Sequence, residues 1–546
     1  MLADDVTIDQ ILTALSVIGS VQMDRPARNE RTFLDTFDWR VHEAGWSLHH
    51  TRDRIGRRLA LHDRASGRMR VSAVAETAPR FTADLPTGPL HRALAPVLDV
   101  RTLLPLATVR TESTTVRILD TETKTVLRVV VDHDAIADPA VPEPDLGRRA
   151  RLVAVKGYEP WAKRAGAALA QHLGIEPGPD DLLERAVRAT GRHPGDYSSK
   201  LRLTLDPALS TGEAATVILG TFLATIEVNR PGARADLDPE FLHDLRVAVR
   251  RTRATLKALA SVVPEAIRQD VREGFTWLGR ATGEARDLDV MVLDLSDAER
   301  DAAAQGSDAA RELAPLHAHL RLRRAAAYEA LDRDLGSPRC QGLLDLWRTA
   351  LARPWPVPAA IEAGGEAGGE TGGEGAIQAG GEAGGEGDGT EPVTGVARAR
   401  VLAAHRRVTR RGRAITATSA AEDLHDLRKR AKELRYLLEC FASLFSRRDV
   451  DPIVTELKAL QDNLGRFQDH QVQADALRRF ADEMVHGAGA PTATLMRMGR
   501  LAADQDRASE QARAEFAERF AAFDRAQNHR RFARLFAPAP TPAPAR

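Results

Sequence analysis

One stretch of the sequence decides the fold: LHDLRVAVRRTR at residues 242–253, which recurs as LHDLRKRAKELR at residues 424–435. Six of the twelve positions are identical, and the second copy follows the first by 182 residues. The same offset pairs Gly283 with Gly465 without a gap. A repeat of this length, in a chain rich in Ala, Leu and Arg, predicts two copies of one helical bundle.

The repeat occupies the second part of the chain, and its halves span residues 212–353 and 396–537. Apolar residues recur there with a period near 3.6, which is typical of amphipathic helices. A looser match between 328–344 and 516–532 extends the correspondence toward the end of each half. Duplicated units of this size predict an all-α domain of two pseudo-symmetric four-helix bundles.

The first 175 residues have a different pattern, which predicts mostly strands and turns. Residues 106–117 and 124–134 are rich in Val, Thr and Leu and are separated by a polar turn, so they predict a hairpin. Residues 153–155 predict a further strand, and 160–173 predicts a helix. The chain as a whole is therefore expected to be α+β, with an antiparallel β domain before the helical one.

The chain has two low-complexity segments, one within the helical domain and one after it. Residues 361–395 repeat Ala-Gly-Gly-Glu and residues 538–546 alternate Pro and Ala, so neither has apolar surface to bury. We divide the chain into an N-terminal extension (1–27), a β domain (28–175), a connector (176–210), a helical domain (211–537) interrupted by the acidic linker (361–395), and a tail (538–546).

The charge balance is uneven along the chain. The formal net charge is zero, from 77 basic and 77 acidic residues, but eight acids and no base lie between Arg353 and Arg398. The rest of the chain therefore carries +8. Cys340 and Cys440 are too few for a disulfide framework or a zinc site, and predict buried reduced thiols. Lacking a basic, cleavable leader or an apolar run of about 20 residues, the protein is expected in the cytoplasm with no membrane partner.

Both copies of the repeat place cations on one face of a helix. At 100° per residue, a first stripe about 80° wide and about 21 Å long contains His243, Arg246, Arg250, Arg253 and Lys257. A second stripe contains His425, Arg428, Lys432 and Arg435. Apolar residues occupy the opposite side of each helix, so the stripes face away from the core.

The composition of the stripes indicates a phosphate-rich ligand. A solvated helix face, the plain alternative, would mix charges, because like charges one turn apart repel. Arginine matches phosphate oxygens with a planar fork of donors, and lysine and histidine add further positive charge. Regular spacing suits a linear polyanion held between the two stripes. Further basic contacts are expected from neighbouring helices: Arg321, Arg324, Arg400, Arg407 and Arg411.

Two acidic segments have plain structural interpretations. Residues 286–289, Arg-Asp-Leu-Asp, predict a helix start at which an aspartate caps free amides, rather than a catalytic site. The linker 361–395 is interpreted as a tolerated insertion between the repeats. The alternative is that its eight carboxylates compete with the ligand for the basic stripes.

Residues 210–535 resemble the CHAD domain. The marks are the two Leu-His-Asp-Leu-Arg stretches, Arg-Asp-Leu-Asp-Val at 286–290 and Leu-Gln-Asp-Asn-Leu-Gly at 460–465. The resemblance implies two four-helix bundles with a basic surface or pore, binding of inorganic polyphosphate, and association with polyphosphate granules. By the family pattern the ligand contacts are His243, Arg246, Arg250, Arg253, His425, Arg428, Lys432 and Arg435.

Residues 28–175 resemble a degenerate CYTH domain, the antiparallel β tunnel or barrel of triphosphate-processing enzymes. The marks are FLDTFDW at 33–39, GWSL at 45–48 and KGY at 156–158. The family opens with Glu-x-Glu-x-Lys, whose carboxylates hold a divalent metal, and no such spacing occurs upstream of Thr32. Histidines replace expected basic residues, but without partner carboxylates we expect no metal site at His42, His49, His50 or His62.

Three functions follow from these observations. The first is a cofactor-free, non-enzymatic protein that binds inorganic polyphosphate, with the CYTH-like part non-catalytic. The second is a metal-dependent triphosphate hydrolase or cyclase of the CYTH type. The third is a nucleic-acid-binding protein, which is disfavoured because few aromatic residues accompany the stripes for base stacking. We expect the first, and the sequence leaves the oligomeric state open.

Overall fold

The structure, a computed structural model, describes residues 2–3, 6–138, 145–174, 178, 181–304, 308–353, 355, 391–487 and 489–537. The chain divides into two compact units between Lys200 and Leu201, and each is described by itself. The first is built on a β sheet and the second on helices, so the predicted α+β class is confirmed. The predicted tail and residues 361–390 of the predicted linker lie outside the described residues, whereas the end of the predicted linker is described and a helix begins within it, at Val393.

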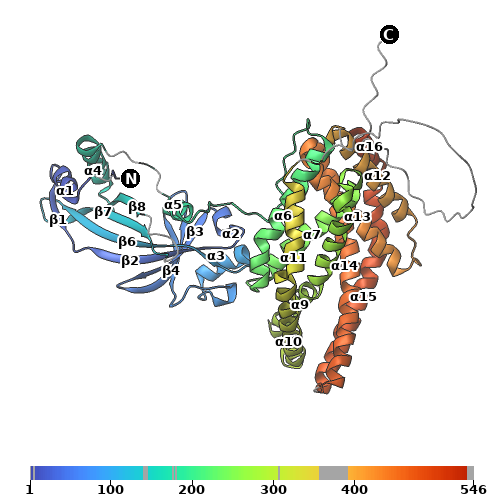
Figure 1. Cartoon of the computed structure of the whole chain (residues 1–546). Helices are drawn as coiled ribbons and strands as arrows, with labels where there is room; N and C mark the ends of the chain where they lie inside the picture. The colour runs from blue at the N-terminus through green and yellow to red at the C-terminus, as the bar shows by residue number, and fades with distance from the viewer. Residues whose placement is uncertain are drawn as a thin grey trace, which may run out of the picture. The chain divides into compact units, whose positions relative to one another are not determined.

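The N-terminal unit contains one antiparallel sheet of eight strands (Figure 1). They are β1 (Ser20–Met23), β2 (Ala27–Asp35), β3 (Trp46–Asp53), β4 (Gly56–Asp63), β5 (Met69–Val74), β6 (Leu104–Leu119), β7 (Thr125–Ile136) and β8 (Asp145–Ala154). The order is β5-β4-β3-β2-β6-β7-β8, and β1 pairs with the far half of the long strand β6. Among the described residues β5 and β8 do not pair with each other, so the sheet is open where the resemblance implied a tunnel or barrel.

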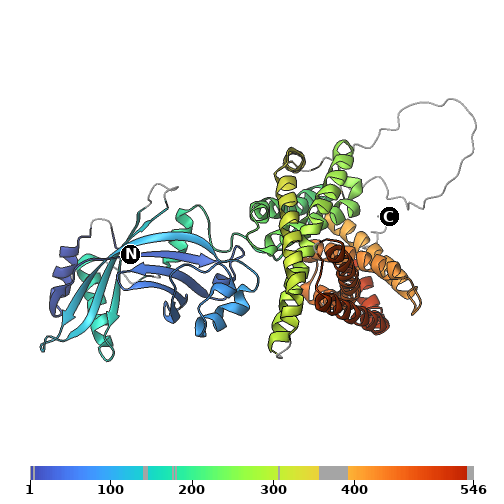
Figure 2. The same ribbon diagram turned by 90° about the horizontal axis from the view of Figure 1, so that it is seen from below.

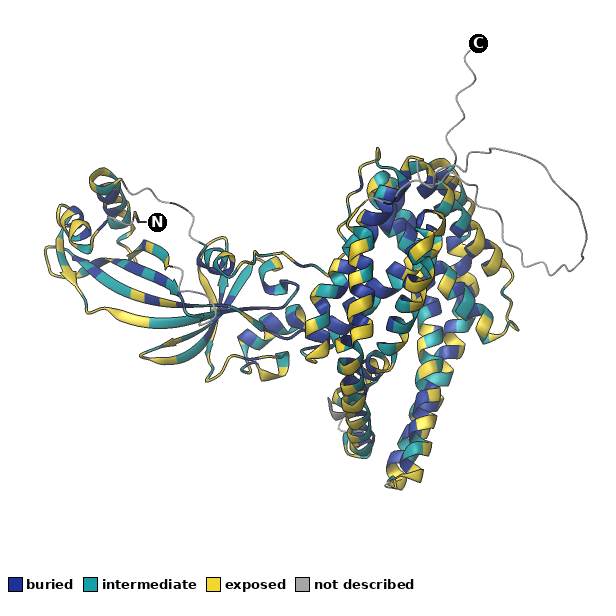
Figure 3. Cartoon of the chain, viewed as in Figure 1, coloured by how far each residue is buried: buried dark blue, intermediate teal, exposed yellow. Residues whose placement is uncertain are grey.

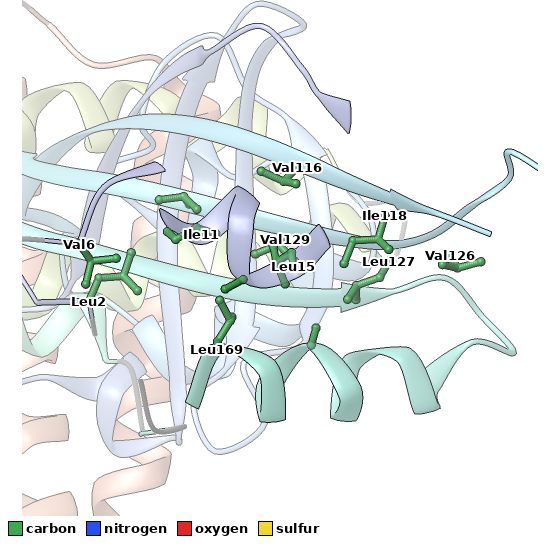
Figure 4. Packing of buried hydrophobic residues seen from close by; sticks show 13 residues of the cluster. Leu2, Val6, Ile11, Leu15, Val116, Ile118, Val126, Leu127, Val129 and Leu169 are labelled. Carbon is green, nitrogen blue, oxygen red and sulfur yellow. The ribbon is translucent and has the colours of Figure 1, made fainter. Parts of the chain in front are cut away.

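Five α-helices accompany this sheet: α1 (Ile8–Ser16), α2 (Arg40–Glu43), α3 (Pro89–Leu98), α4 (Glu159–Leu173) and α5 (Leu182–Ala189). The predicted hairpin is confirmed as β6 and β7, with Val116 opposite Val129, and the helix predicted at 160–173 is confirmed as α4. Helices α1 and α4 lie at the same end of the sheet in both views (Figures 1 and 2). Figure 4 shows Leu15 and Leu169 packed against Val129 there.

Helix α5 departs from the prediction, because residues 176–210 were expected to connect two domains. Asp181 caps this helix by accepting a hydrogen bond from the Glu184 amide at 3.1 Å. Leu183 and Val187 then pack into a core with Phe33 of the sheet. The Pro, Gly and Asp content of the segment concealed a short amphipathic helix, whose burial outweighs the surrounding turn formers.

The C-terminal unit contains two runs of helices that repeat one another. The first run is α6 (Thr211–Arg234), α7 (Pro239–Ala258), α8 (Glu265–Ala281), α9 (Gly283–Ala304), α10 (Ala309–Gly336) and α11 (Pro338–Leu351). The second run is α12 (Val393–Arg413), α13 (Ala421–Phe441), α14 (Arg447–His486), α15 (Thr492–Phe523) and α16 (Ala526–Phe536). The starts of α12, α13 and α14 follow those of α6, α7 and α8 by 182 residues, the offset found in the sequence.

The two runs differ in that one long helix of the second run corresponds to two shorter helices of the first. The continuous helix α14 corresponds to both α8 and α9, which are separated at Thr282. The Leu278 carbonyl accepts hydrogen bonds from both the Thr282 hydroxyl, at 2.8 Å, and the Thr282 amide, at 3.2 Å. The counterpart of Thr282 in the second copy is the apolar Leu464, and α14 continues through this point.

Each helix of the C-terminal unit buries one side, as the alternation of dark blue and yellow in Figure 3 shows. Cys340 and Cys440 are buried and free, as predicted. One described helix, α6, is long and apolar enough to cross a membrane, whereas the sequence had indicated no such run. Half of its apolar window is buried within the protein, which is also typical of a soluble core helix.

Candidate functional site

The two basic stripes lie on α7 and α13, the second helices of the two runs. The Asp238 side chain caps α7 by accepting hydrogen bonds from the amides of Glu240 (2.9 Å) and Phe241 (3.3 Å), and Pro239 occupies the first helical position. On the core side, Leu245 of α7 and Leu434 of α13 are fully buried. Burial of these faces fixes the rotation of each helix about its axis, and so fixes where the stripes point.

Helices α7 and α13 contact each other, and ion pairs join them. The Lys257 ammonium lies 2.7 Å from a Glu433 carboxylate oxygen, and the Arg251 guanidinium lies 2.7 Å from Glu439. Both pairs join residues of different repeats. The two helices therefore lie side by side, and the stripes converge on one region of the C-terminal unit.

The centre of this region is formed by Arg250 of α7 and Lys432 of α13. Burial and, to a smaller extent, the neighbouring cations Arg428 and Arg250 together lower the pKa of Lys432 to about 8. The Nε atoms of Arg250 and Arg428 are buried and have no hydrogen-bond partner. Among the described residues no ion pair involves Arg250 or Lys432. Positive charge that forms no ion pair is thus concentrated where the two repeats meet, and the nearby carboxylates of Asp469 and Asp287 offset only part of it.

Acidic residues from neighbouring helices partly neutralise the stripes. Arg428 donates a hydrogen bond of 2.9 Å to Asp469 of α14. The repeat counterparts of this pair are Arg246 and Asp287, and the charge of Asp287 counteracts the effect of burial, which lowers the pKa of Arg246. Arg435 donates a hydrogen bond of 2.6 Å to Glu439 on its own helix. The structure therefore places about half of the predicted cations beside carboxylates, which the helical wheel did not show.

A smaller set of cations forms no ion pair, although Asp287 acts electrostatically on one of them, Arg246. Arg246 donates hydrogen bonds to the Thr282 hydroxyl (3.1 Å) and the Gly279 carbonyl (3.3 Å). Arg253 is exposed, and no ion pair to it is found in the described part of the chain. Together with the central pair, these residues make up what we call the cationic centre: Arg246, Arg250, Arg253 and Lys432.

The two histidines of the stripes occupy different environments. His425 Nδ1 contacts the Gln468 side-chain oxygen on α14. His243 lies with Glu240 and Asp244 in a group whose ligand atoms are all within 4.8 Å, the one such cluster among the residues that the structure describes. The Arg286 guanidinium lies 3.9 Å from Glu240 and supplies positive charge that disfavours a divalent ion at this position.

The additional basic contacts predicted from neighbouring helices are not gathered at the cationic centre. Arg324 donates to Asp289 (2.7 Å) and to Asp236 (2.6 and 2.7 Å), and Asp289 also accepts a hydrogen bond of 2.7 Å from the Tyr328 hydroxyl. Arg411 pairs with Asp426 at 3.1 Å. The remaining three lie elsewhere on α10 and α12: Arg321 lines a separate pocket, Arg400 lies 3.5 Å from Ser261, and Arg407 is exposed.

The predicted helix start at residues 286–289 is wrong. Helix α9 begins at Gly283, so Asp287 and Asp289 lie inside it and cap no free amides. Asp289 instead belongs to the ion-pair network of Arg324, and Asp287 faces the first stripe. Burial raises the pKa of both aspartates above the ordinary value. Their role is to place negative charge between helices, which helix-start statistics could not indicate.

Two arginines near the stripes were missed by the sequence analysis. Arg286 of α9 and Arg479 of α14 both act electrostatically on Asp287. Their repeat counterparts are Gln468 and Asp297, so neither belongs to the duplicated pattern that drew attention to the stripes. Only the three-dimensional packing of α7 against α9 and α14 brings them close.

A comparison with family models identifies this helical unit. The CHAD domain model matches residues 217–478, which include both stripes and the acidic residues between them. Residues 217–478 of the chain match the CHAD domain family. No curated protein matches the chain.

The solved structures to which parts of the chain are similar include a CHAD domain. A CHAD domain from the plant Ricinus communis is 25% identical, with a TM-score of 0.45, covering 59% of this chain and 96% of that one. PptA from Streptomyces chartreusis is 19% identical, with a TM-score of 0.42, covering 57% and 99%. A putative adenylyl cyclase from Hippeastrum, described as having a dominant triphosphatase activity, is 13% identical, with a TM-score of 0.26, covering 36% and 96%.

Outside the CHAD domain, the N-terminal unit has a polar face on its sheet. Arg31 and His49 lie on this face, and burial lowers the pKa of both, that of Arg31 to about 10. The two aspartates of the face are paired: Asp132 with Arg151 at 2.9 Å, and Asp134 with Arg149 at 2.8 Å. These carboxylates therefore neutralise arginines.

The four histidines of this unit do not form one group. The rings of His49 and His62 lie 4.6 Å apart between centroids. His50 points to the other side of the sheet, where its Nε2 lies 2.8 Å from the Ala75 carbonyl, and His42 belongs to α2. No group of three potential metal ligands is found among the described residues of the N-terminal unit.

Proposed function

We propose that this protein binds inorganic polyphosphate through the cationic centre of its CHAD domain. One observation carries the proposal: Arg250 and Lys432, from different repeats, meet, and neither forms an ion pair among the described residues, although the Asp469 carboxylate acts on Lys432 from nearby. Burial and the neighbouring cations lower the pKa of Lys432, and holding like charges together destabilises the free protein. A polyanion would relieve this repulsion, and CHAD domains are associated with polyphosphate.

The shape of the site supports a linear ligand. The cations are distributed along α7 and α13, and each stripe covers several helical turns. A small anion would need donors that converge on one point, whereas a chain of phosphates presents oxygens at regular intervals. Arginine forks at Arg246, Arg250 and Arg253 suit those oxygens. Such a role is consistent with a cytoplasmic protein at polyphosphate granules, which we include in the proposal.

We propose further that the N-terminal unit does not catalyse phosphate release. Metal-dependent hydrolysis of a triphosphate needs free carboxylates to hold the metal and activate water. Asp132 and Asp134 are instead paired with Arg151 and Arg149. A phosphate-release assay with Mg²⁺ and Mn²⁺, using tripolyphosphate and ATP, tests this directly. Turnover that chelation abolishes would favour the triphosphate hydrolase or cyclase instead.

Competition between ligands tests the binding function. Labelled long-chain polyphosphate bound to the protein is challenged with unlabelled polyphosphate or with single-stranded DNA of equal charge. We expect polyphosphate to compete at far lower concentration, because the stripes lack the aromatic platforms on which bases stack. Equal or better competition by DNA would favour the nucleic-acid-binding alternative.

A further inference from the structure

A second group of arginines surrounds a hollow of about 770 Å³ at the start of α14 and along α16. Its lining contains four arginines and one aspartate, which gives a net charge of +3: Ser446, Arg448, Asp449, Gln527, Arg530, Arg531 and Arg534. We call it the α16 hollow. It contains no residue of either basic stripe.

The α16 hollow is separated from the basic stripe of α13 by about three and a half turns of α14. This helix is continuous from Arg447 to His486, so Arg448 lies about 20 Å from Gln461 at 1.5 Å per residue. Gln461 in turn contacts Arg435, the nearest stripe residue on that side, at 3.3 Å. The hollow is therefore a distinct site, and the inference drawn from it does not depend on the proposed function of the stripes.

Internal contacts do not neutralise this charge. Arg534 forms an ion pair with Asp449, the one acid in the lining. Arg531 donates a hydrogen bond of 3.3 Å to the neutral Asn528 side chain. In the described part of the chain, no ion pair involves Arg448, Arg530 or Arg531. Arg530 and Arg534 also stand four residues apart on one helix, where like charges repel.

The two copies of the repeat share these helices but differ in the arginines that line the hollow. Helices α8 and α11 correspond to α14 and α16, and their starting residues place Ala266 opposite Arg448 and Gly342 opposite Arg530. The buried Leu343 corresponds in the same way to Arg531. The first copy thus forms the same helices without these arginines. Neither helix formation nor packing requires them, which points to a ligand.

The lining also restricts the kind of ligand. No aromatic residue lines the hollow, so it offers no platform for a nucleobase. Its side chains are almost all charged or polar, which disfavours an apolar tail. Three guanidinium groups with no acidic partner match the oxygens of adjacent phosphoryl groups. We propose that the α16 hollow is a second anion site, which binds a short inorganic phosphate oligomer.

Calorimetric titration of the full-length protein with sodium tripolyphosphate tests this proposal. The variant Arg530→Gln with Arg531→Gln removes two cations, keeps the Arg534–Asp449 pair and retains good helix formers. We expect it to lose the hollow's binding event, with a drop in affinity there of at least about tenfold. The matched control, Arg333→Gln with Arg500→Gln, removes the same charge from exposed positions and should bind as the wild type does.

A variant with three stripe substitutions, His243→Ala, Arg250→Ala and Lys432→Ala, separates this proposal from the proposed function. Binding at the hollow should persist in that variant and disappear when the two α16 substitutions are added. The proposal is overturned if the α16 variant titrates like the wild type, or if the control loses as much. It is also overturned if an oligothymidylate displaces tripolyphosphate from the stripe variant. Thermal melting confirms that each variant is folded.

Discussion

At the scale of single residues, Lys432 shows most directly how the fold prepares a charge for a ligand. Burial and the neighbouring guanidinium groups lower its pKa to about 8, so the free protein carries a partly neutral lysine in mildly alkaline solution. A bound anion stabilises the charged form and raises the pKa again. Polyphosphate affinity should therefore fall as the pH rises from 7 to 9.5, measured by fluorescence anisotropy at constant ionic strength.

The variant Lys432→Arg is the control for this pH dependence, because its guanidinium stays charged over the whole range. Its affinity should change much less between pH 7 and 9.5. Identical pH profiles for the variant and the wild type would contradict the assignment. The same shift has a consequence for stability: a lysine whose pKa is lower in the folded state destabilises the fold at pH 7, and stability recovers as the pH rises past 8.

Arg324 shows that not every predicted cation serves the ligand. Its side chain is mostly buried and donates to Asp236 and to the fully buried Asp289. Arg324→Ala would leave Asp289 without its cationic partner, so we expect a loss of about 3 kcal/mol in unfolding free energy, measured by urea denaturation. Polyphosphate affinity at a temperature where the variant is folded should stay within about twofold. A large loss of affinity without a loss of stability would place Arg324 in the binding site instead.

At the scale of secondary-structure elements, the acids that α14 supplies regulate how much charge the stripes offer. Asp469 is mostly exposed and pairs with Arg428 of α13. Asp469→Asn should release Arg428 for the ligand and raise polyphosphate affinity by about threefold at low salt. Asp475→Asn is a matched control, since Asp475 lies on the same helix and pairs with Arg478 outside the stripes. Unchanged or weaker binding by the first variant would show that the Asp469 carboxylate does not compete with the ligand.

The elements also show which features the sequence could predict. The hairpin of β6 and β7 and the stripes of α7 and α13 depend on local periodicity, so they were predicted correctly. Helix α9 begins at Gly283, whereas the sequence predicted a helix start at residues 286–289. Helix α5 was missed because its stability comes from packing against Phe33, which is far away in the sequence.

At the scale of the whole molecule, the duplicated pattern predicted where basic residues collect. It did not predict which of them are paired with acidic residues of the other repeat. Lys257 pairs with Glu433 and Arg251 with Glu439, and each pair joins the two repeats. Such contacts depend on how the bundles pack together, which a helical wheel of one segment cannot contain. The sequence therefore predicted where positive charge collects, and the structure reduced nine predicted contacts to a cationic centre of four residues.

The whole protein should show the salt dependence of a polyelectrolyte interaction. If the four cations of the cationic centre each neutralise one phosphate, the slope of log K against log salt should be about −3. Titrations between about 50 and 300 mM NaCl give this slope. Chelation of metal ions should leave this slope unchanged, because the proposed binding mode uses no metal. A slope near zero, or binding that EDTA abolishes, would contradict this mode of recognition.

The most direct test compares long-chain polyphosphate binding by the wild type and by the variant His243→Ala, Arg250→Ala, Lys432→Ala. Removing these charges from both helices should weaken binding by about 100-fold, while Arg333→Gln with Arg500→Gln should change it little. Isothermal titration at fixed salt, with melting curves to confirm folding, supplies both numbers. A triple variant that binds as tightly as the wild type would contradict the account that the two repeats join to hold one polyanion.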